Sequence, residues 1–155
     1  MENIKLIRSN SSHEDFKKLV DELNVYLRAV DGDEHAFYNQ YNGIENLNNI
    51  VVAYLDDEPV ACGAFKKFDN FSVEIKRMYT KPEARKHGFA SKVLRELEHW
   101  ALEENFNNTI LETGKRQLEA VNFYKKNNYN IIPNFGPYQG IENSVCFKKN
   151  LHEKR

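Results

Sequence analysis

Apolar residues recur at helical spacing in the first part of the chain. They follow one another every three or four positions, a period that predicts an amphipathic helix, and the residues concerned are Phe16, Leu19, Val20, Leu23 and Leu27. Ser11 and Glu14 have the Ser-x-x-Glu form of a capping box, so we expect the helix to start there and to run to about Val30. Residues 34–41 could form a short second helix.

Strand-like patterns dominate from residue 50. Ile50–Leu55 is a continuous apolar run with β-branched residues, which is typical of a strand buried on both faces. Val60–Phe65 follows after a turn, and Phe71–Lys76 then alternates apolar and polar residues. These three segments predict an antiparallel meander. A shorter alternation at Ile4–Ile7 predicts one more strand near the N-terminus.

Helices and strands alternate in the second half of the chain. A helix is expected after Gly88, because an apolar stripe follows it at Val93, Leu94, Leu97, Trp100 and Ala101. The remaining segments are a strand, a helix and two strands, at Thr109–Leu111, Gln117–Lys126, Tyr129–Ile132 and Ser144–Lys148. This order predicts an α/β (α+β) fold with a mixed sheet covered by helices. No linker or repeat divides the sequence, so we expect one domain over residues 1–155.

Charge and composition restrict the classes of partner. The chain has 22 Lys and Arg residues against 23 Asp and Glu residues, a formal net charge of −1. This balance gives no reason to expect nucleic acid or an anionic membrane as the main partner. The N-terminus lacks the apolar core of a signal peptide, and no apolar run approaches membrane-spanning length. We therefore expect a soluble, cytoplasmic protein.

The two cysteines do not form a disulfide framework. Cys62 and Cys146 lie far apart in apolar, strand-like runs, so we expect buried, reduced thiols. No cluster of His, Cys and carboxylate residues has the spacing of metal ligands, and no metal is predicted.

The loop before the helix that follows Gly88 is the most informative segment for function. The start of a helix has unpaired amide groups and the positive end of the helix dipole, which favour phosphate binding. Gly88 and Ala90 would let a diphosphate approach the backbone closely, and Arg85 and Lys86 add positive charge. An ordinary basic loop has the same composition, so the loop alone leaves both interpretations open.

The pattern Arg85-x-x-Gly88-x-Ala90 resembles the Arg/Gln-x-x-Gly-x-Gly/Ala signature of the GNAT acetyltransferases. The expected order of elements is also similar to that of this superfamily over nearly the whole chain. The resemblance implies the GNAT fold, a mixed and mostly antiparallel sheet of about seven strands covered by about four helices. It also implies an N-acetyltransferase that uses acetyl-CoA. The implied cofactor-binding positions are Met78, Thr80, Arg85, Lys86, His87, Gly88, Phe89, Ala90, Ser91, Gln117 and Asn122.

Two residues are candidates for proton transfer. Tyr124 lies in a segment that resembles the Ala-x-x-Leu-Tyr segment of the family's last helix, where the tyrosine hydroxyl reaches the cofactor sulfur; a core tyrosine is the alternative. Glu74 is separated from Arg85 by a distance that resembles that of the base glutamate in the histone-acetylating branch. A solvated Glu is a poor base for an ammonium group, so this role requires burial or a water relay. A solvent-facing Glu74 paired with Lys76 or Arg77 is the alternative.

The acceptor is expected to be a small-molecule amine that attacks directly in a ternary complex. The first two helices and their connection roof the acceptor cleft in this family, and a stiff loop near the C-terminus suggests a second wall. The candidate acceptor-binding residues are Arg28, Glu34, His35, Tyr38, Arg77, Phe135 and Tyr138. Arg28 and Arg77 would suit an acceptor that carries a carboxylate. A solvated helix connection and a long hairpin loop are the alternatives for the two walls.

Two other hypotheses about the function stay open at this point. The acceptor could be a protein lysine or an N-terminal amine, or the domain could bind acetyl-CoA as a regulatory ligand without turnover. The resemblance also implies a possible homodimer, formed through the C-terminal strands.

Overall fold

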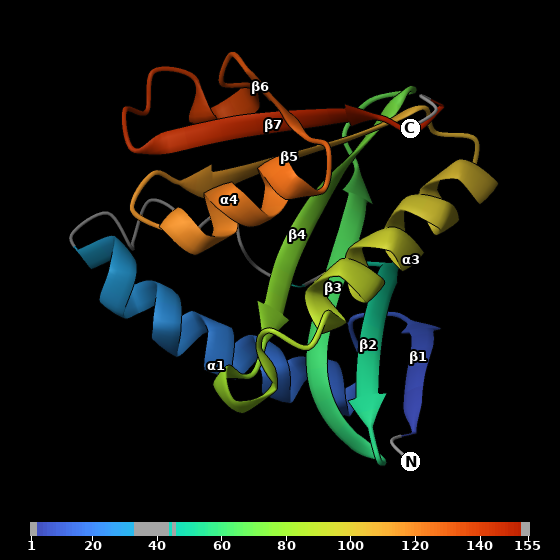
Figure 1. Ribbon diagram of the computed structural model, residues 1–155. Helices are drawn as coiled ribbons and strands as arrows, with labels where there is room; N and C mark the ends of the chain where they lie inside the picture. Colours follow the sequence, from blue (N-terminus) through green and yellow to red (C-terminus); the bar gives the residue numbers. More distant parts are fainter. Residues whose placement is uncertain (1–2, 33–43, 45, 153–155) are drawn as a thin grey trace.

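The computed structural model describes residues 3–32, 44 and 46–152, and all seven of its strands pair in one sheet (Figure 1). The strands are β1 (Ile4–Ser9), β2 (Asn49–Leu55), β3 (Glu58–Lys67), β4 (Ser72–Thr80), β5 (Asn108–Gly114), β6 (Asn130–Ile132) and β7 (Ser144–Asn150). Their order in the sheet is β1-β2-β3-β4-β5-β7-β6, and only the β4–β5 pairing is parallel. The predicted mixed, mostly antiparallel sheet is confirmed.

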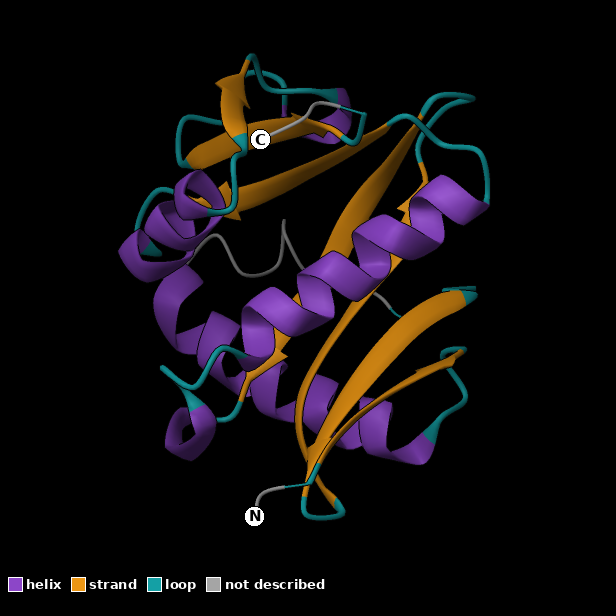
Figure 2. Cartoon of the chain, turned by 45° about the vertical axis from the view of Figure 1, so that its right-hand side comes forward, coloured by secondary structure: helices purple, strands orange, loops and turns teal. Residues whose placement is uncertain are grey.

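Helices cover both faces of this sheet (Figure 2). The described α-helices are α1 (Glu14–Asp31), α3 (Phe89–Glu103) and α4 (Leu118–Lys126), with short 3₁₀ helices at η2 (Pro82–Ala84) and η3 (Gly136–Tyr138). The short helix expected at 34–41 lies outside the described residues. No helix in the described part of the chain is both long and apolar enough to cross a membrane.

Strand β2 separates two hydrophobic cores. Val51 and Ala53 pack in the core that contains α3 and α4, whereas Ile50 and Val52 pack in the core that contains α1. A continuous apolar strand is required here because both of its faces are covered by helices. The prediction of a strand buried on both faces is confirmed.

The start of α1 differs from the predicted capping box. The helix begins at Glu14 with His13 as its N-cap, and the His13 Nδ1 accepts a hydrogen bond from the amide of Phe16. The amide and hydroxyl of Ser12 both donate to Oδ1 of Asn10. The turn before the helix is thus closed by Asn10, and the prediction that Ser11 caps the helix is wrong.

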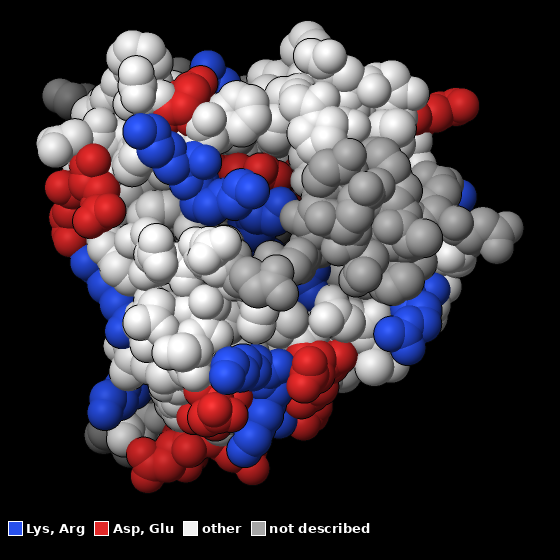
Figure 3. Space-filling model, turned by 180° about the vertical axis from the view of Figure 1, so that it is seen from behind, with Lys and Arg blue, Asp and Glu red and all other residues white. Residues whose placement is uncertain are grey.

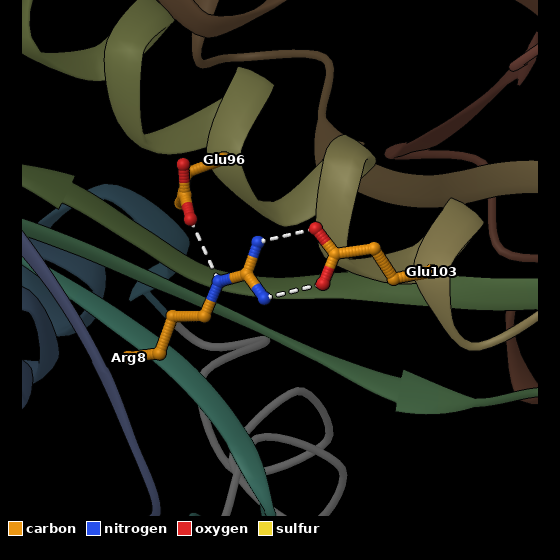
Figure 4. Close-up of polar contacts among 3 residues, drawn as sticks. All are labelled: Arg8, Glu96 and Glu103. Atoms are coloured by element: carbon orange, nitrogen blue, oxygen red, sulfur yellow. Dashed lines mark hydrogen bonds and ion pairs between the residues drawn. The ribbon is translucent and has the colours of Figure 1, made fainter.

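An ion cluster ties the edge strand β1 to α3 (Figure 4). Arg8 Nε lies 2.7 Å from Glu96 Oε2, and Nη1 and Nη2 lie 2.7 and 3.0 Å from the two carboxylate oxygens of Glu103. The guanidinium also lies over the ring of Trp100, with 4.9 Å between its central carbon and the ring centroid. Because β1 pairs only with β2 among the described strands, this cluster gives the edge strand a second attachment.

A second polar cluster lies inside the protein. Lys149 Nζ is 2.8 Å from Glu98 Oε1, and the Tyr129 hydroxyl donates to Glu98 Oε2 at 2.8 Å. The Thr109 hydroxyl lies 2.7 Å from that of Tyr129. All four residues are buried, so the hydrogen bonds replace the water that each group loses on folding.

The divergence of β4 and β5 opens the sheet. Ser72, Val73 and Glu74 pair with Asn108–Ile110, and beyond these positions β4 remains paired with β3 while β5 continues beside β7. Figure 1 shows the two strands separating from their common end. None of the described strands therefore pairs with the second half of β4 on its β5 side, and the cleft described below lies there.

A bulge in β4 lies next to this opening. The β3–β4 register shifts between Cys62 and Ala64, and Arg77 has a φ of 58°. A Cβ atom placed on Gly63 would lie 2.4 Å from the Met78 sulfur. A larger residue at this position would force the Met78, Leu97 and Val93 side chains to shift, so glycine favours the close packing of β3, β4 and α3 around the bulge.

Candidate active site

A cavity of about 110 Å³ occupies the opening between β4 and β5. The residues that line it come from α1, β4, β5, α4 and the loop that contains η3, and they are Leu23, Leu27, Glu74, Ile75, Lys76, Arg77, Met78, Glu112, Thr113, Gly114, Gln117, Ala120, Tyr124 and Tyr138. Leu23 of α1 and Tyr124 of α4 belong to the cores on opposite faces of the sheet, so helices from both faces border the cavity.

The loop before α3 has the geometry of a phosphate site. Lys86 and Gly88 have φ angles of 70° and 83°, and no side chain caps α3 and no acidic residue lies in its first turn. A Cβ atom on Gly88 would meet nothing within 4 Å. No described side chain therefore caps the first amides of α3, and the space beside Gly88 is open at the positive end of the helix dipole, an arrangement that fits the pyrophosphate of coenzyme A.

The individual side chains of this loop contribute differently. Arg85 Nε donates to the carbonyl of Thr80 at 3.0 Å, which directs its side chain back to the end of β4. Phe89 is buried in the core, so only its backbone can reach a ligand. Lys86 and His87 are exposed, whereas Ala90, Ser91, Met78 and Thr80 are half-buried.

Tyr124 combines a core position with a place in the cleft wall. Its ring packs against those of Tyr129 and Phe147, with centroid separations of 5.7 and 6.0 Å, and the residue is 7% exposed. Burial, reinforced by the charge of Glu112, raises the pKa of the Tyr124 hydroxyl above its usual range. The hydroxyl is therefore protonated at neutral pH and can donate a proton or a hydrogen bond.

Glu74 is buried at the point where β4 and β5 separate. It is 6% exposed, which rules out the solvent-facing alternative, although the expected ion pair with Lys76 is present at 3.5 Å. The Tyr138 hydroxyl donates to the same carboxylate oxygen, Oε2, at 3.2 Å. Burial and the charge of Glu74 raise the pKa of Tyr138, which keeps this donor protonated.

Arg77 lies between the cleft and α1. Its Nη2 donates to Oδ1 of Asn24, while its buried Nε has no hydrogen-bond partner among the described residues. Burial lowers the pKa of Arg77 to about 10, so the guanidinium still carries its charge at neutral pH. Burial also lowers the pKa of Lys76, against the opposing effect of Glu74.

Basic side chains gather on the side of the molecule seen from behind. Figure 3 shows Lys and Arg side chains around a recess in which acidic side chains also lie. The charges of Lys66 and Arg77 both act on Lys76, and Lys66 pairs with Glu74 across β3 and β4. The β4 wall of the cleft, lined by Glu74, Lys76 and Arg77, is thus strongly polar.

Several predicted site residues do not line the cleft. Arg28 and Asn122 are exposed on α1 and α4 and are not among its described lining residues. The ring of Phe135 makes edge-to-face contacts with the rings of Phe68 and Tyr138, with centroid separations of 5.2 and 5.5 Å. It therefore packs against Tyr138 without lining the cleft itself. Three of the predicted acceptor-binding residues lie outside the described residues, namely Glu34, His35 and Tyr38.

Other lining residues were not predicted. Glu112 and Thr113 were missed because the expected strand ended at Leu111, whereas β5 continues to Gly114. Leu23 and Leu27 were assigned to the core by their spacing, and periodicity does not reveal that this end of α1 overhangs a cleft. No group of three or more His, Cys, Asp or Glu side chains in the described ranges could hold a metal ion.

The family and the known structures agree with this geometry. Residues 16–129 match the model of the acetyltransferase (GNAT) family. A relative named IAA acetyltransferase from Azospirillum brasilense is 28% identical over 157 residues, which cover 97% of this chain and 100% of the relative.

Solved structures show the same fold. A protein from Klebsiella pneumoniae subsp. pneumoniae MGH 78578, provisionally named an acyl-CoA N-acyltransferase, superposes with a TM-score of 0.80 at 25% identity, covering 96% of this chain and 97% of the other. The PaiA N-acetyltransferase of Thermoplasma acidophilum, solved with coenzyme A, gives a TM-score of 0.68 at 17% identity, with 96% and 99% covered. The chain is an acetyl-CoA-dependent acetyltransferase and belongs to the GNAT family.

Proposed function

We propose that the protein transfers the acetyl group of acetyl-CoA to the primary amine of a small molecule, by direct attack within a ternary complex. The observation that carries this proposal is the cleft between β4 and β5, where Glu74 and Tyr124 contribute to different walls of one cavity of about 110 Å³. A cavity of this size suits a small amine. The uncapped start of α3 would bind the pyrophosphate through the amides that follow Gly88.

Acetyl-CoA supplies an activated acyl group, and side chains of the cleft take a proton from the amine and give a proton to the leaving thiolate. The acceptor arrives as an ammonium and must lose a proton, and Glu74 is the base in this proposal. Among the described residues both contacts of its carboxylate fall on Oε2, from Tyr138 and Lys76, which leaves Oε1 to accept that proton.

The second proton goes to the departing sulfur. As the new N–C bond forms and the C–S bond breaks, the thiolate takes a proton from the Tyr124 hydroxyl, which is later restored from solvent. The raised pKa of Tyr124 keeps the hydroxyl protonated until that step. Starting from the ammonium, the nitrogen loses two protons in each turnover, one to Glu74 before attack and one to solvent as the amide forms. One proton reaches the thiol, so one proton is released overall.

The test is thiol release from acetyl-CoA with a panel of amines, namely amino acids, polyamines, aminoglycosides and lysine-bearing peptides. We expect release with one class of small molecule. Release with the peptides alone would contradict the proposed acceptor class.

A pair of glycine variants tests the cofactor site in the same assay. Gly88→Glu places bulk and negative charge beside the first amides of α3, and we expect it to abolish acetyl-CoA binding measured by calorimetry. Gly140→Glu is the matched control, because Gly140 also has a positive φ, of 78°, and open space around its Cβ position, but lies outside the cleft. Equal binding by the two variants would place the pyrophosphate elsewhere.

A further inference from the structure

The cleft carries side chains of both signs, and Glu74 and Lys76 form an ion pair within it. Glu74 and Glu112 act together on Tyr138, and Glu112 also acts on Tyr124, so the two carboxylates lie around these tyrosines. Arg77 instead contacts Asn24 of α1. An acceptor in this cleft would meet carboxylates near Tyr138 and the guanidinium of Arg77 beside α1.

Arg77 is the cation of the cleft that lacks a carboxylate partner among the described residues. Lys76 is paired with Glu74 at 3.5 Å, whereas no salt bridge within the described ranges includes Arg77. The residue is 5% exposed and its Nε has no acceptor in the described part of the chain. A buried donor without an acceptor is costly, and a buried charge is normally paired.

The surroundings of Arg77 hold its guanidinium in place. The bulge in β4 gives Arg77 its positive φ, and the Asn24 side chain accepts a hydrogen bond from Nη2. A planar guanidinium fixed in this way presents several donors to a carboxylate, which is the anion that it pairs with most readily. The charge of Arg77 also acts on the adjacent Lys76, whose own charge is paired with Glu74.

We infer that Arg77 binds a carboxylate of the acceptor, so that the substrate class is an amine that also carries a carboxylate, as in an amino acid. This inference rests on the proposed function, since it specifies the acceptor of the same reaction. The ammonium of such a molecule would lie toward Glu74 and its carboxylate toward Arg77 and Asn24. Each of its two charges would then meet a group of opposite charge in the cleft.

Matched acceptors test this inference through kinetics. Amino acids are compared with their amides and with the corresponding decarboxylated amines, each measured by thiol release. We expect kcat/KM to be at least about tenfold higher for the carboxylates, because a hydrogen-bonded charge pair contributes on this scale. In Arg77→Gln and Arg77→Lys this ratio should fall toward one, mainly through KM, whereas Arg95→Gln, an exposed site on α3, should preserve it.

The kinetic outcomes that overturn the inference are clear. Equal turnover of acids and amides by the natural protein would remove the need for a carboxylate site. A ratio that survives in both Arg77 variants would assign the selectivity to another residue. Melting temperatures of all variants show whether a loss of activity reflects loss of the fold.

A binding measurement separates this inference from the proposed function. The Nε–H resonance of Arg77, assigned by its absence in Arg77→Lys, is followed by NMR during titration with N-acetylglycine and with its amide. A shift with the carboxylate alone supports the inference even if no amine of the panel is acetylated, a result that would contradict the proposed function instead. No shift with either probe, or equal shifts with both, overturns the inference.

Discussion

Two pairs of opposite charge are buried among the residues that the structure describes, and they differ in how completely they are satisfied. Glu98 and Lys149 are 2.8 Å apart, and Tyr129 and Thr109 extend the pair into a chain of hydrogen bonds within the core. Glu74 and Lys76 are 3.5 Å apart, line a cavity, and lie beside Arg77, whose Nε has no partner among the described residues.

This difference separates a structural role from a binding role. A fully satisfied network inside the core holds its elements in one arrangement and offers nothing to a ligand. The Glu74–Lys76 pair faces a cavity and lies next to Arg77, which has no carboxylate partner among the described residues. These side chains can therefore still bind a ligand and exchange protons with it. The comparison predicts that equivalent substitutions in the two pairs will affect different properties.

The largest expected effect is on stability, from Glu98→Gln. Removal of this carboxylate leaves Lys149 buried without its counter-charge, and we expect the free energy of unfolding to fall by roughly 3–5 kcal/mol, measured by urea denaturation. Glu74→Gln is the matched variant. We expect it to lower kcat/KM by about 10²-fold or more while the unfolding free energy falls less, since Lys76 faces a cavity that water can enter.

A double substitution checks the explanation for Glu98. Replacement of both charges, as in Glu98→Leu with Lys149→Met, should recover much of the lost stability, because no unpaired charge remains. If Glu98→Gln were as stable as the natural protein, or if Glu74→Gln retained full turnover, the two pairs would not differ in the way that their contacts indicate.

Two adjacent tyrosines sharpen the comparison at a smaller scale. Tyr124 and Tyr129 lie 5.7 Å apart between ring centroids, but Tyr124 lines the cleft whereas Tyr129 donates to Glu98. We expect Tyr124→Phe to lower turnover by at least about tenfold with little change in acetyl-CoA affinity. Tyr129→Phe should instead lower the unfolding free energy by about 1–3 kcal/mol, because it removes a buried hydrogen bond to the charged carboxylate of Glu98.

Kinetics and denaturation of the same two variants decide this prediction. Unaltered turnover in Tyr124→Phe would show that Tyr124 is a core aromatic residue and not the acid. Reduced turnover of equal size in both variants would mean that packing, rather than the hydroxyl in the cleft, explains the effect.

The fold was largely predictable because its signals are local. The apolar run at Ile50–Leu55 and the stripe after Gly88 each require one kind of element, and both were found where expected. The capping box at Ser11 failed because Asn10 and His13 compete for the same turn, and a short pattern does not decide between such contacts.

The candidate site was less predictable because it depends on distant contacts. The alternation at Phe71–Lys76 predicted a polar face for β4 but not its burial, which arises where β5 diverges and Tyr138 covers Glu74. The left-handed conformation of Arg77 has no sequence signal, since a non-glycine residue seldom adopts it. Arg28 has the same chemistry as Arg77, and only the structure separates the exposed side chain from the buried one.

The smallest expected effect concerns the exposed cluster of Arg8, Glu96 and Glu103. Exposed ion pairs contribute little, so Arg8→Ala should lower Tm by no more than about 4 °C, and high salt should reduce the difference. Trp100 is the single tryptophan of the chain and lies beneath the guanidinium, so its fluorescence reports on this contact.

Arg8→Met separates charge from packing, because its side chain can still cover the Trp100 ring. If charge dominates, Met and Ala at this position should give the same Tm, and both differences should shrink at 1 M salt. If packing on the ring dominates, Met should preserve the natural Tm and emission maximum at all salt concentrations. A loss of Tm as large as that expected for Glu98→Gln would contradict the ranking, because an exposed cluster would then contribute as much as a buried one.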